Sequence, residues 1–416
     1  MLRLLAAAVL AGALAVPAGS ARPGAGSALP PLPRGWPKVL QIGLTDDGEA
    51  AALRRSVGAR LGFRYTYLAG GVNTGEGWAT WQPGGGFVSH YDASSFANGI
   101  TPVFSYYMLR QSKPGGSDET KADLANLNNL ATMRAYWADV ALFFQRAKAK
   151  KTVVLHVEPD LWGYVEYAAK GDAASTVPAK VAATGRADLA GLPDTAAGAA
   201  QAFVRLRDRY APNVLLAWHL SGWGTREDIG YSDPPLGHVD AVARKAARFY
   251  RSFGARFDLV FTDASDADAA YKQKVDGDRG ASWWRAGDYR RFSRLWSTFA
   301  RAAGRRVVVW QIPVGNTKMR AQNNTSGHFQ DNHVQWWLGE GTRSRVQALA
   351  RAGVIGLLFG AGGEGSTCAC DARHDGVTNP APIDGNTLRS LNADDDGGYF
   401  KARARVYLRR PVRLPK

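Results

Sequence analysis

Eight short apolar runs, all containing β-branched residues, recur along the chain and alternate with segments of helical periodicity. The runs are Lys38–Asp46, Phe63–Leu68, Thr101–Leu109, Thr152–Glu158, Asn213–Ser221, Phe257–Asp263, Arg306–Pro313 and Gly353–Gly360. Nearly continuous apolar runs suit parallel strands that are buried on both faces. Eight such strands, joined by connections that can hold helices, predict an α/β fold of the (β/α)₈ TIM-barrel class.

Helical patterns fill most of the connections. We expect helices at Glu49–Leu61, Glu119–Lys150, Thr195–Tyr210, Val239–Phe253, Asp288–Ala303 and Arg343–Ala352, and a short one at Ala93–Asn98. An open doubly wound sheet is the alternative, but no glycine-rich phosphate loop follows the first run, where Asp46 and Asp47 stand. No internal repeat or change of composition marks a second module, so residues 38–416 are expected to form one catalytic-type domain.

Loop lengths distinguish the two ends of the expected barrel. Connections that leave the C-terminal ends of the strands are long, for example residues 159–194 and 264–287. Connections that lead back from helices into strands are short, for example residues 211–212 and 304–305. Barrels that carry chemistry place it on the face with the long loops, so the C-terminal face is where we expect the site.

The first residues have the pattern of an export signal. Arg3 precedes the apolar run Leu4–Val16, and small residues then offer cleavage after Ala18 or Ala21. We therefore expect residues 1–21 to be a signal peptide and residues 22–37 to be a mobile Pro/Gly/Ser-rich spacer. The mature protein is expected to be secreted, either extracellular or associated with the cell wall.

The fourth expected strand ends in His156-Val157-Glu158-Pro159-Asp160-Leu161-Trp162, the most informative stretch of the sequence. Alternation along a strand places His156, Glu158 and Asp160 on one side, toward the barrel interior. A partly desolvated carboxylate there has a raised pKa, which suits it to donate a proton near neutral pH. The alternative is a strand-end carboxylate that caps a loop or pairs with an arginine.

This Glu-Pro pair resembles the acid/base site of the retaining TIM-barrel glycosidases, in which Asn-Glu-Pro is usual. The resemblance implies a glycoside hydrolase in which Glu158 protonates the glycosidic oxygen. Val157 replaces the usual Asn, and the seventh expected strand carries Gln311 where that group carries its nucleophilic Glu. We therefore expect a glycosidase-like barrel rather than a member of that group.

A second carboxylate must then come from another strand. Asp263 is the first charged residue after the sixth apolar run. The fourth and sixth strands share parity around a barrel, so their inward side chains can face one another. We expect Asp263 to be the second catalytic carboxylate, with Asp160 as the alternative partner. A turn or helix-cap role is the other interpretation of Asp263.

Aromatic and polar side chains of the long loops suit the recognition of a sugar, because indole rings stack on the apolar faces of pyranoses. The tryptophans concerned are Trp78, Trp81, Trp162, Trp223, Trp283, Trp284 and Trp310. They would equally serve to anchor the loops. The residues expected to bind substrate are His156, Asp160, Trp162, His219, Trp223, Tyr106, Trp310, Gln311, His328, Asp331, Asn332 and His333.

Metal chemistry finds little support in the sequence. The first expected strand lacks histidine, and no His-Glu-x-x-His pattern occurs. We expect no cofactor and no metal, although a chelator-sensitive hydrolase remains an alternative. The only two cysteines, Cys368 and Cys370, are expected to form a local bridge or to stay free thiols.

The chain carries 52 Lys and Arg against 36 Asp and Glu, a formal net charge of +16. The basic residues form no compact stripe, which argues against a nucleic-acid partner. We expect a carbohydrate substrate, with the charge favouring an acidic one, no membrane insertion, and a monomer. The alternative function is a catalytically silent barrel that binds glycans or cell-wall polymers, which the missing seventh-strand carboxylate favours.

Overall fold

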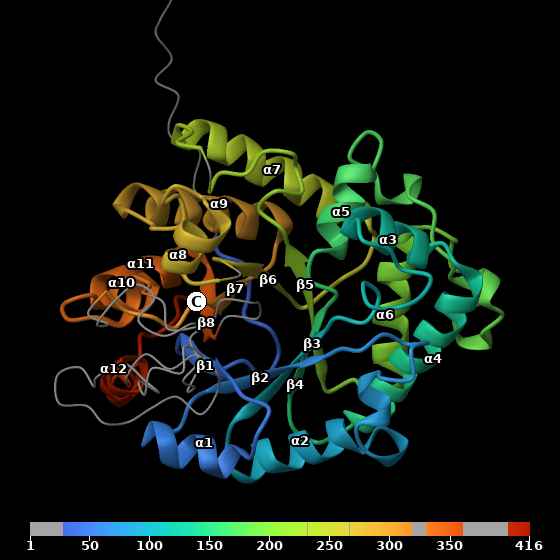
Figure 1. Ribbon diagram of the computed structural model, residues 1–416, viewed down its shortest axis with the longest axis horizontal. Helices are drawn as coiled ribbons and strands as arrows, with labels where there is room; N and C mark the ends of the chain where they lie inside the picture. Colours follow the sequence, from blue (N-terminus) through green and yellow to red (C-terminus); the bar gives the residue numbers. More distant parts are fainter. Residues whose placement is uncertain (1–27, 231, 266, 318–329, 361–397) are drawn as a thin grey trace, which may run out of the picture.

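The computed structural model describes residues 28–230, 232–265, 267–317, 330–360 and 398–416. Eight parallel strands close a barrel in the order β1 to β8, and helices surround it (Figure 1). The strands are β1 (Gln41–Thr45), β2 (Phe63–Leu68), β3 (Thr101–Tyr106), β4 (Val153–Val157), β5 (Val214–Leu220), β6 (Leu259–Asp263), β7 (Val307–Ile312) and β8 (Val354–Phe359). The predicted (β/α)₈ class is confirmed.

The helices lie mostly where the sequence predicts them. They are α1 (Ala50–Val57), α2 (Gly86–Ala97), α3 (Glu119–Leu127), α4 (Leu130–Arg146), α5 (Leu161–Ala168), α6 (Ala196–Tyr210), α7 (Leu236–Ser252), α8 (Ala269–Tyr271), α9 (Ala286–Ala303), α10 (His333–Leu338), α11 (Arg343–Ala352) and α12 (Tyr399–Arg409). Single turns are η1 (Trp78–Thr80), η2 (Pro83–Gly85), η3 (Ala174–Thr176), η4 (Ala182–Thr184), η5 (Ala187–Leu189) and η6 (Lys272–Asp276). Among the described residues, the helices are all too short or too polar to cross a membrane.

Two helix predictions were wrong in extent. The helix expected at Glu119–Lys150 is divided into α3 and α4, because the side chain of Asn129 accepts a hydrogen bond from the backbone N–H of Thr132 and starts a new helix. The helix expected at Ala93–Asn98 is only the end of α2, which begins at Gly86. Val88 and Tyr91, which are buried and spaced three residues apart as on one helix face, belong to the half that the prediction left out.

The pairing of β3 to β6 determines which side chains meet inside the barrel. Ser105 of β3 pairs with His156 of β4, and His156 pairs with Ala217 of β5. His219, two residues further along β5, pairs with Phe261 of β6. Because inward positions alternate along each strand, His219 and then Asp263 stand progressively closer to the C-terminal mouth.

The segment that we expected to be a mobile spacer is, in its described part, packed against the N-terminal end of the barrel. Trp36 is buried and stacks on Phe63 at the start of β2, with ring centroids 4.8 Å apart. The buried guanidinium of Arg306 donates hydrogen bonds to the carbonyl oxygens of Pro30 and Pro415. Residues near both ends of the described chain therefore close this face together.

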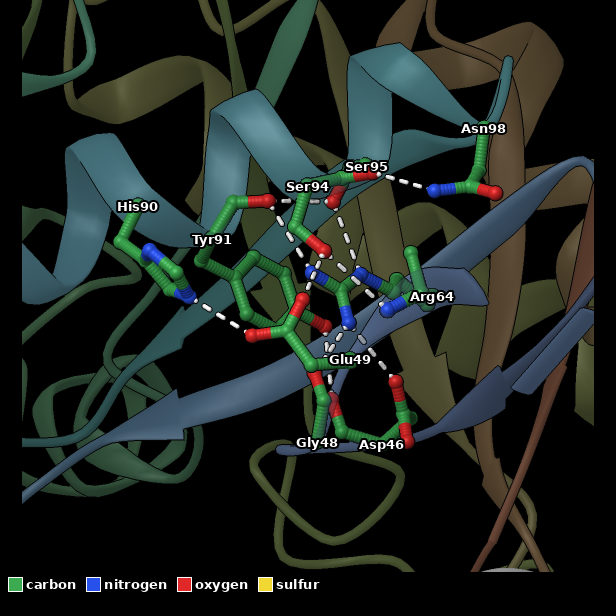
Figure 2. Close-up of polar contacts among 10 residues, drawn as sticks. Asp46, Gly48, Glu49, Arg64, His90, Tyr91, Ser94, Ser95 and Asn98 are labelled. Atoms are coloured by element: carbon green, nitrogen blue, oxygen red, sulfur yellow. Dashed lines mark hydrogen bonds and ion pairs between the residues drawn. The ribbon is translucent and has the colours of Figure 1, made fainter. Parts of the chain in front are cut away.

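A buried arginine ties β2 to α2 on the outside of the barrel. Figure 2 shows Arg64 donating to Oδ2 of Asp46 at 2.8 Å, to Oγ of Ser95 at 2.8 Å and to the carbonyl oxygen of Tyr91 at 3.0 Å. The guanidinium also lies 3.7 Å from the centre of the Tyr91 ring. Asp46 is therefore an ion-pair partner inside the fold, and it does not cap α1, whose N-cap is Glu49.

Candidate functional site

A cavity of about 510 Å³ opens at the C-terminal ends of β4 to β7. Its walls combine strand ends with the long loops that follow β4, β5 and β6. The lining residues that bear carboxylate, imidazole, amide or aromatic groups are Glu119, Asp160, Tyr164, Tyr167, His219, Trp223, Asp228, Asp263, Trp284, Phe292, Trp310 and Gln311. The cavity lies on the face that the loop lengths indicated.

Within the described part of the wall, four carboxylates (those of Glu119, Asp160, Asp228 and Asp263) stand against one lysine. Glu119 accepts a hydrogen bond from the Tyr164 hydroxyl at 2.7 Å and lies 3.7 Å from Nε of Arg110. The lysine, Lys272, is itself paired with Asp276 at 3.5 Å. Carboxylates therefore outnumber cations in this wall, and the cavity is acidic although the chain as a whole is basic.

Asp228 has the environment of a proton donor. Burial raises the pKa of its carboxyl, and the negative charge of Asp263 raises it further. The backbone N–H of Gly230, which donates to Asp228 at 2.7 Å, opposes this shift without cancelling it. Two neighbouring carboxyls, one of which has a raised pKa, form an arrangement that can divide acid and base roles between two residues.

Asp263 lies at the end of β6. A row of polar side chains extends from the barrel interior to its carboxylate. Nε2 of His219 lies 3.6 Å from Oδ1 of Asp263. Nδ1 of His219 lies 3.0 Å from Nε2 of His156, and Nδ1 of His156 lies 3.1 Å from Oγ of Ser105. Burial lowers the pKa of His156 well below its ordinary value, so this ring is neutral near pH 7.

Glu158 is buried and does not line the cavity. Its Oε1 accepts hydrogen bonds from the backbone N–H groups of Met108 and Leu109, at 3.3 and 3.1 Å, and from the Tyr136 hydroxyl at 2.8 Å. Burial, with the nearby carboxyl of Asp123, raises the pKa of Glu158 well above its ordinary value. The pKa of this carboxyl is raised, as we expected. Its hydrogen bonds, however, connect the end of β4 to the loop after β3 and to α4.

Asp160 stands in the cavity wall directly after the Pro159 turn. Its φ of 71° lies in the left-handed region, which few residues other than glycine adopt. Asp160 and Asp263 both act on the hydroxyl of Tyr67. Burial raises the pKa of Tyr67 most, and the negative charges of Asp160 and Asp263 raise it further. The two carboxylates therefore act on one phenol at the barrel mouth.

Aromatic rings supply the apolar part of the wall. Trp223 packs against Tyr164 with ring centroids 4.9 Å apart, and Trp284 stacks on Phe292 at 4.1 Å. The indole N–H of Trp310 is buried and has no acceptor among the described residues. Flat rings beside carboxylates suit a ligand with both C–H faces and hydroxyl groups.

Two other residues expected to bind substrate face away from the cavity. Tyr106 follows the inward Ser105 and therefore points outward, where its hydroxyl donates to Asp139 on α4. Trp162 is buried in α5, donates to the carbonyl oxygen of Val157 at 2.9 Å and packs edge-on against Phe253. Both side chains hold helices against the barrel.

In the described part of the cluster expected after β7, Asp331 and His333 are buried and Asn332 is half-buried, and none of the three lines the cavity. Asp331 accepts from the backbone N–H of Ala269 at 2.9 Å and from Nδ1 of His333 at 2.8 Å. Asn332 donates to the carbonyl oxygen of Trp284 at 2.9 Å. These contacts stabilise the residues that form the cavity wall. His328, Cys368 and Cys370 lie outside the described residues.

Asp228, Glu119, Tyr164, Tyr167 and Lys272 line the cavity and were not predicted. Asp228 lies in the long connection after β5, which the loop lengths assigned to this face, but no motif or alternation marks a single loop position. Glu119 was assigned to a helix start, and it is the first residue of α3. The described residues contain no cluster of three or more His, Cys, Asp or Glu side chains arranged to hold a metal ion.

No protein-family model and no curated protein sequence matches the chain. Solved structures similar to it include a double mutant of the Cellulomonas fimi endo-β-1,4-mannanase, 13% identical, covering 90% of this chain and 71% of that one with a TM-score of 0.49. The β-glycosidase BGL167 is 14% identical, covering 88% and 87% with a TM-score of 0.43. The GH6 enzyme of Orpinomyces sp. Y102 is 14% identical, covering 85% and 88% with a TM-score of 0.36. The resemblance to glycoside hydrolases is one of fold.

Proposed function

We propose that the protein is a glycoside hydrolase that cleaves a poly- or oligosaccharide by carboxylate acid/base chemistry. The observation that carries the proposal is the cavity wall, in which Asp160, Asp228 and Asp263 stand beside the indoles of Trp223 and Trp310. Carboxylates supply the acid and the base or nucleophile of glycosidic cleavage, and the rings supply a surface for the sugar.

Asp228 and Asp263 divide the roles. Asp228, whose pKa is raised by burial and by Asp263, donates its proton to the glycosidic oxygen as the C–O bond breaks. Asp263, ionised, either attacks the anomeric carbon or takes a proton from the attacking water. Hydrolysis then leaves one new hydroxyl on each product. Asp228 replaces Glu158 as our choice of acid, because Glu158 is absent from the cavity lining.

The negative charge of the cavity wall affects which glycans can bind there. An acidic glycan, which the net charge of the chain favoured, would bring its own carboxylates toward those of Asp160 and Asp263. Like charges at short range in a partly desolvated cavity repel strongly. We therefore propose a neutral or amine-bearing glycan as the substrate.

The test is product release from a panel of neutral, acidic and amine-bearing glycans. Asp263→Asn and Asp228→Asn should each lower turnover by about 10²- to 10⁴-fold, the usual contribution of a positioned acid or base. Asp208→Asn is the matched control, because that carboxylate is exposed on α6 and outside the cavity. Full turnover by both cavity variants would refute the proposal. Binding of a glycan without any product would instead indicate a binding barrel.

We also propose that the protein is exported, on the charged and apolar pattern of residues 1–21. N-terminal sequencing of the protein recovered from culture medium tests this proposal. A new N-terminus after residue 18 or 21 is expected, and recovery only from the cytoplasm with an intact N-terminus would contradict it.

A further inference from the structure

Ser105, His156, His219 and Asp263 come from four consecutive strands, β3 to β6, and form a continuous row from the barrel interior to the cavity. Ser105, His156 and His219 are almost completely buried, whereas the Asp263 side chain is 32% exposed. Parallel pairing places Ser105 beside His156, and the two-residue steps along β5 and β6 bring the next members toward the mouth.

The contacts of the row favour one direction of donation when Asp263 is ionised. Nε2 of His219 lies 3.6 Å from Oδ1 of Asp263, too far for a hydrogen bond, but the negative charge of the carboxylate favours the proton of His219 on this nitrogen. Nδ1 of a neutral His219 is then an acceptor and requires the proton of His156 on Nε2. Nδ1 of His156 in turn accepts from the hydroxyl of Ser105. Each member therefore donates toward the cavity.

Aromatic rings pack on His156 and lie near His219. Phe261 of β6 and Trp310 of β7 pack on His156, with ring centroids 4.6 and 4.7 Å away, and Trp310 also lies 5.8 Å from His219. The titratable groups that face His219 are His156 from β4 and Asp263 from β6. Beyond them, Asp228 and the Tyr67 hydroxyl respond to the charge of Asp263.

We propose that Ser105, His156 and His219 form a one-way hydrogen-bond chain with both imidazoles neutral, and that this chain orients Asp263 and keeps it ionised. This inference rests on the proposed function, because Ser105, His156 and His219 are positioning residues only if Asp263 is a catalytic carboxylate. The hydrogen bonds from Ser105 to His156 and from His156 to His219 polarise one another, so together they strengthen the attraction between Nε2–H of His219 and the carboxylate of Asp263.

The alternative is an ion pair between Asp263 and a cationic His219. A cationic ring donates from both nitrogens, so Nδ1–H of His219 would face Nε2 of His156 and would force the His156 proton onto Nδ1, toward Ser105. The tautomer of His156 therefore distinguishes the two states without any substrate.

The first experiment is a long-range ¹H–¹⁵N correlation spectrum of the histidine rings of the ¹⁵N-labelled full-length protein at pH 7. His156→Gln and His219→Gln variants assign the two rings by the loss of their signals. The expected result is a proton on Nε2 of both. A cationic His219, or a proton on Nδ1 of His156, would overturn the proposal.

The second experiment follows hydrolysis against pH in His156→Gln and His156→Phe. A glutamine amide can donate to His219 and accept from Ser105, whereas phenylalanine can do neither. The His156→Phe change should lower kcat by roughly 10- to 100-fold with little change in KM, as for a misplaced catalytic group, and should move the acidic limb of the profile to higher pH. The His156→Gln change should restore most of the loss.

Several outcomes separate the chain from the proposed function. His90→Gln is the control, because His90 is exposed and contacts Glu49 outside the cavity. Ser105→Ala, a small change that removes only the first donor, should leave the proton of His156 on Nε2 if the chain holds, because Nδ1 of His219 still requires it there. Equal pH profiles for His156→Phe, His156→Gln and the wild type would overturn the positioning role. Protons on Nε2 in a protein that hydrolyses no glycan would support the chain and refute the proposed function.

Discussion

Glu158 and Asp160 are separated by one residue, yet only Asp160 reaches the cavity. Glu158 has a φ of 43° and Asp160 a φ of 71°, so the backbone leaves the extended conformation on both sides of Pro159. The carboxyl of Glu158 accepts hydrogen bonds from Leu109 and Tyr136, whereas Asp160 stands in the cavity wall. The end of one strand therefore presents two acids to two different environments.

Glu158→Gln should keep the fold and most of the activity. Burial raises the pKa of Glu158 well above its ordinary value, which favours the neutral acid, and the amide oxygen of glutamine can accept the same three hydrogen bonds. Glu158→Ala should instead destabilise the protein by about 1–3 kcal/mol, because it leaves buried donors without an acceptor. Urea unfolding and turnover of both variants check this prediction. Loss of turnover in a stable Glu158→Gln would return the acid role to Glu158.

The protein should be more stable at pH 5 than at pH 8. Burial raises the pKa values of Asp92, Asp123 and Glu166 to about 8. Between about pH 4 and pH 8 the folded state therefore binds more protons than the unfolded state, and the free energy of unfolding falls as pH rises, by about 1.4 kcal/mol per pH unit for each such carboxyl.

Urea unfolding across this pH range measures the slope, and Asp92→Asn provides the matched comparison. Both carboxylate oxygens of Asp92 are buried without a partner among the described residues, so the amide removes one titrating group from the window. The variant should show a shallower slope than the wild type. Identical slopes would mean that Asp92 ionises in the folded protein as it does in the unfolded chain.

Arg64→Met should destabilise the fold strongly. The substitution leaves Asp46 buried without its cation and removes the donors to Ser95 and to the carbonyl oxygen of Tyr91. Breaking a buried ion pair by removing one member costs about 3–5 kcal/mol. Urea unfolding of the variant gives the value.

His90→Gln is the control for that substitution, because Figure 2 places the His90–Glu49 contact beside the Arg64 network while both side chains are exposed. Exposed ion pairs contribute little, so its free energy of unfolding should stay near that of the wild type. Equal decreases in the free energy of unfolding of the two variants would show that the Arg64 contacts stabilise the fold no more than the exposed His90–Glu49 pair does.

Binding should depend on the charge of the glycan. A glucosamine oligomer should bind the cavity more tightly than a neutral oligomer of equal length, and the difference should shrink as salt is added, because the opposite charges are then screened. A galacturonate oligomer should bind most weakly. Calorimetric titration at two salt concentrations measures all three. The tightest binding by galacturonate would contradict the assignment of the acidic wall as the substrate site.

The sequence predicts the barrel well because the pattern that builds it is local. A buried parallel strand is an uninterrupted apolar run, and each of β1 to β8 lies within the run that predicted it. Alternation also predicts that His156 faces the barrel interior, where it pairs with Ser105, whereas Tyr106, the residue that we expected at the site on β3, faces outward.

The cavity wall is less predictable because alternation ends where the strand ends. Glu158 and Asp160 follow Val157, the last residue of β4, and the turn at Pro159 then sets their directions. Asp228 lies in a loop, where position depends on tertiary contacts such as the hydrogen bond from Gly230. Long-range contacts of this kind leave no periodic trace in the sequence.

Arg306 has a practical consequence for anyone who wishes to immobilise the protein. Its guanidinium donates hydrogen bonds to Pro30 and Pro415, which holds both residues at the end of the barrel opposite the cavity. A carrier domain, an affinity handle or a solid support attached beyond either proline is therefore joined at the closed end. The open end then faces outward, toward an insoluble polymer that cannot diffuse to the protein.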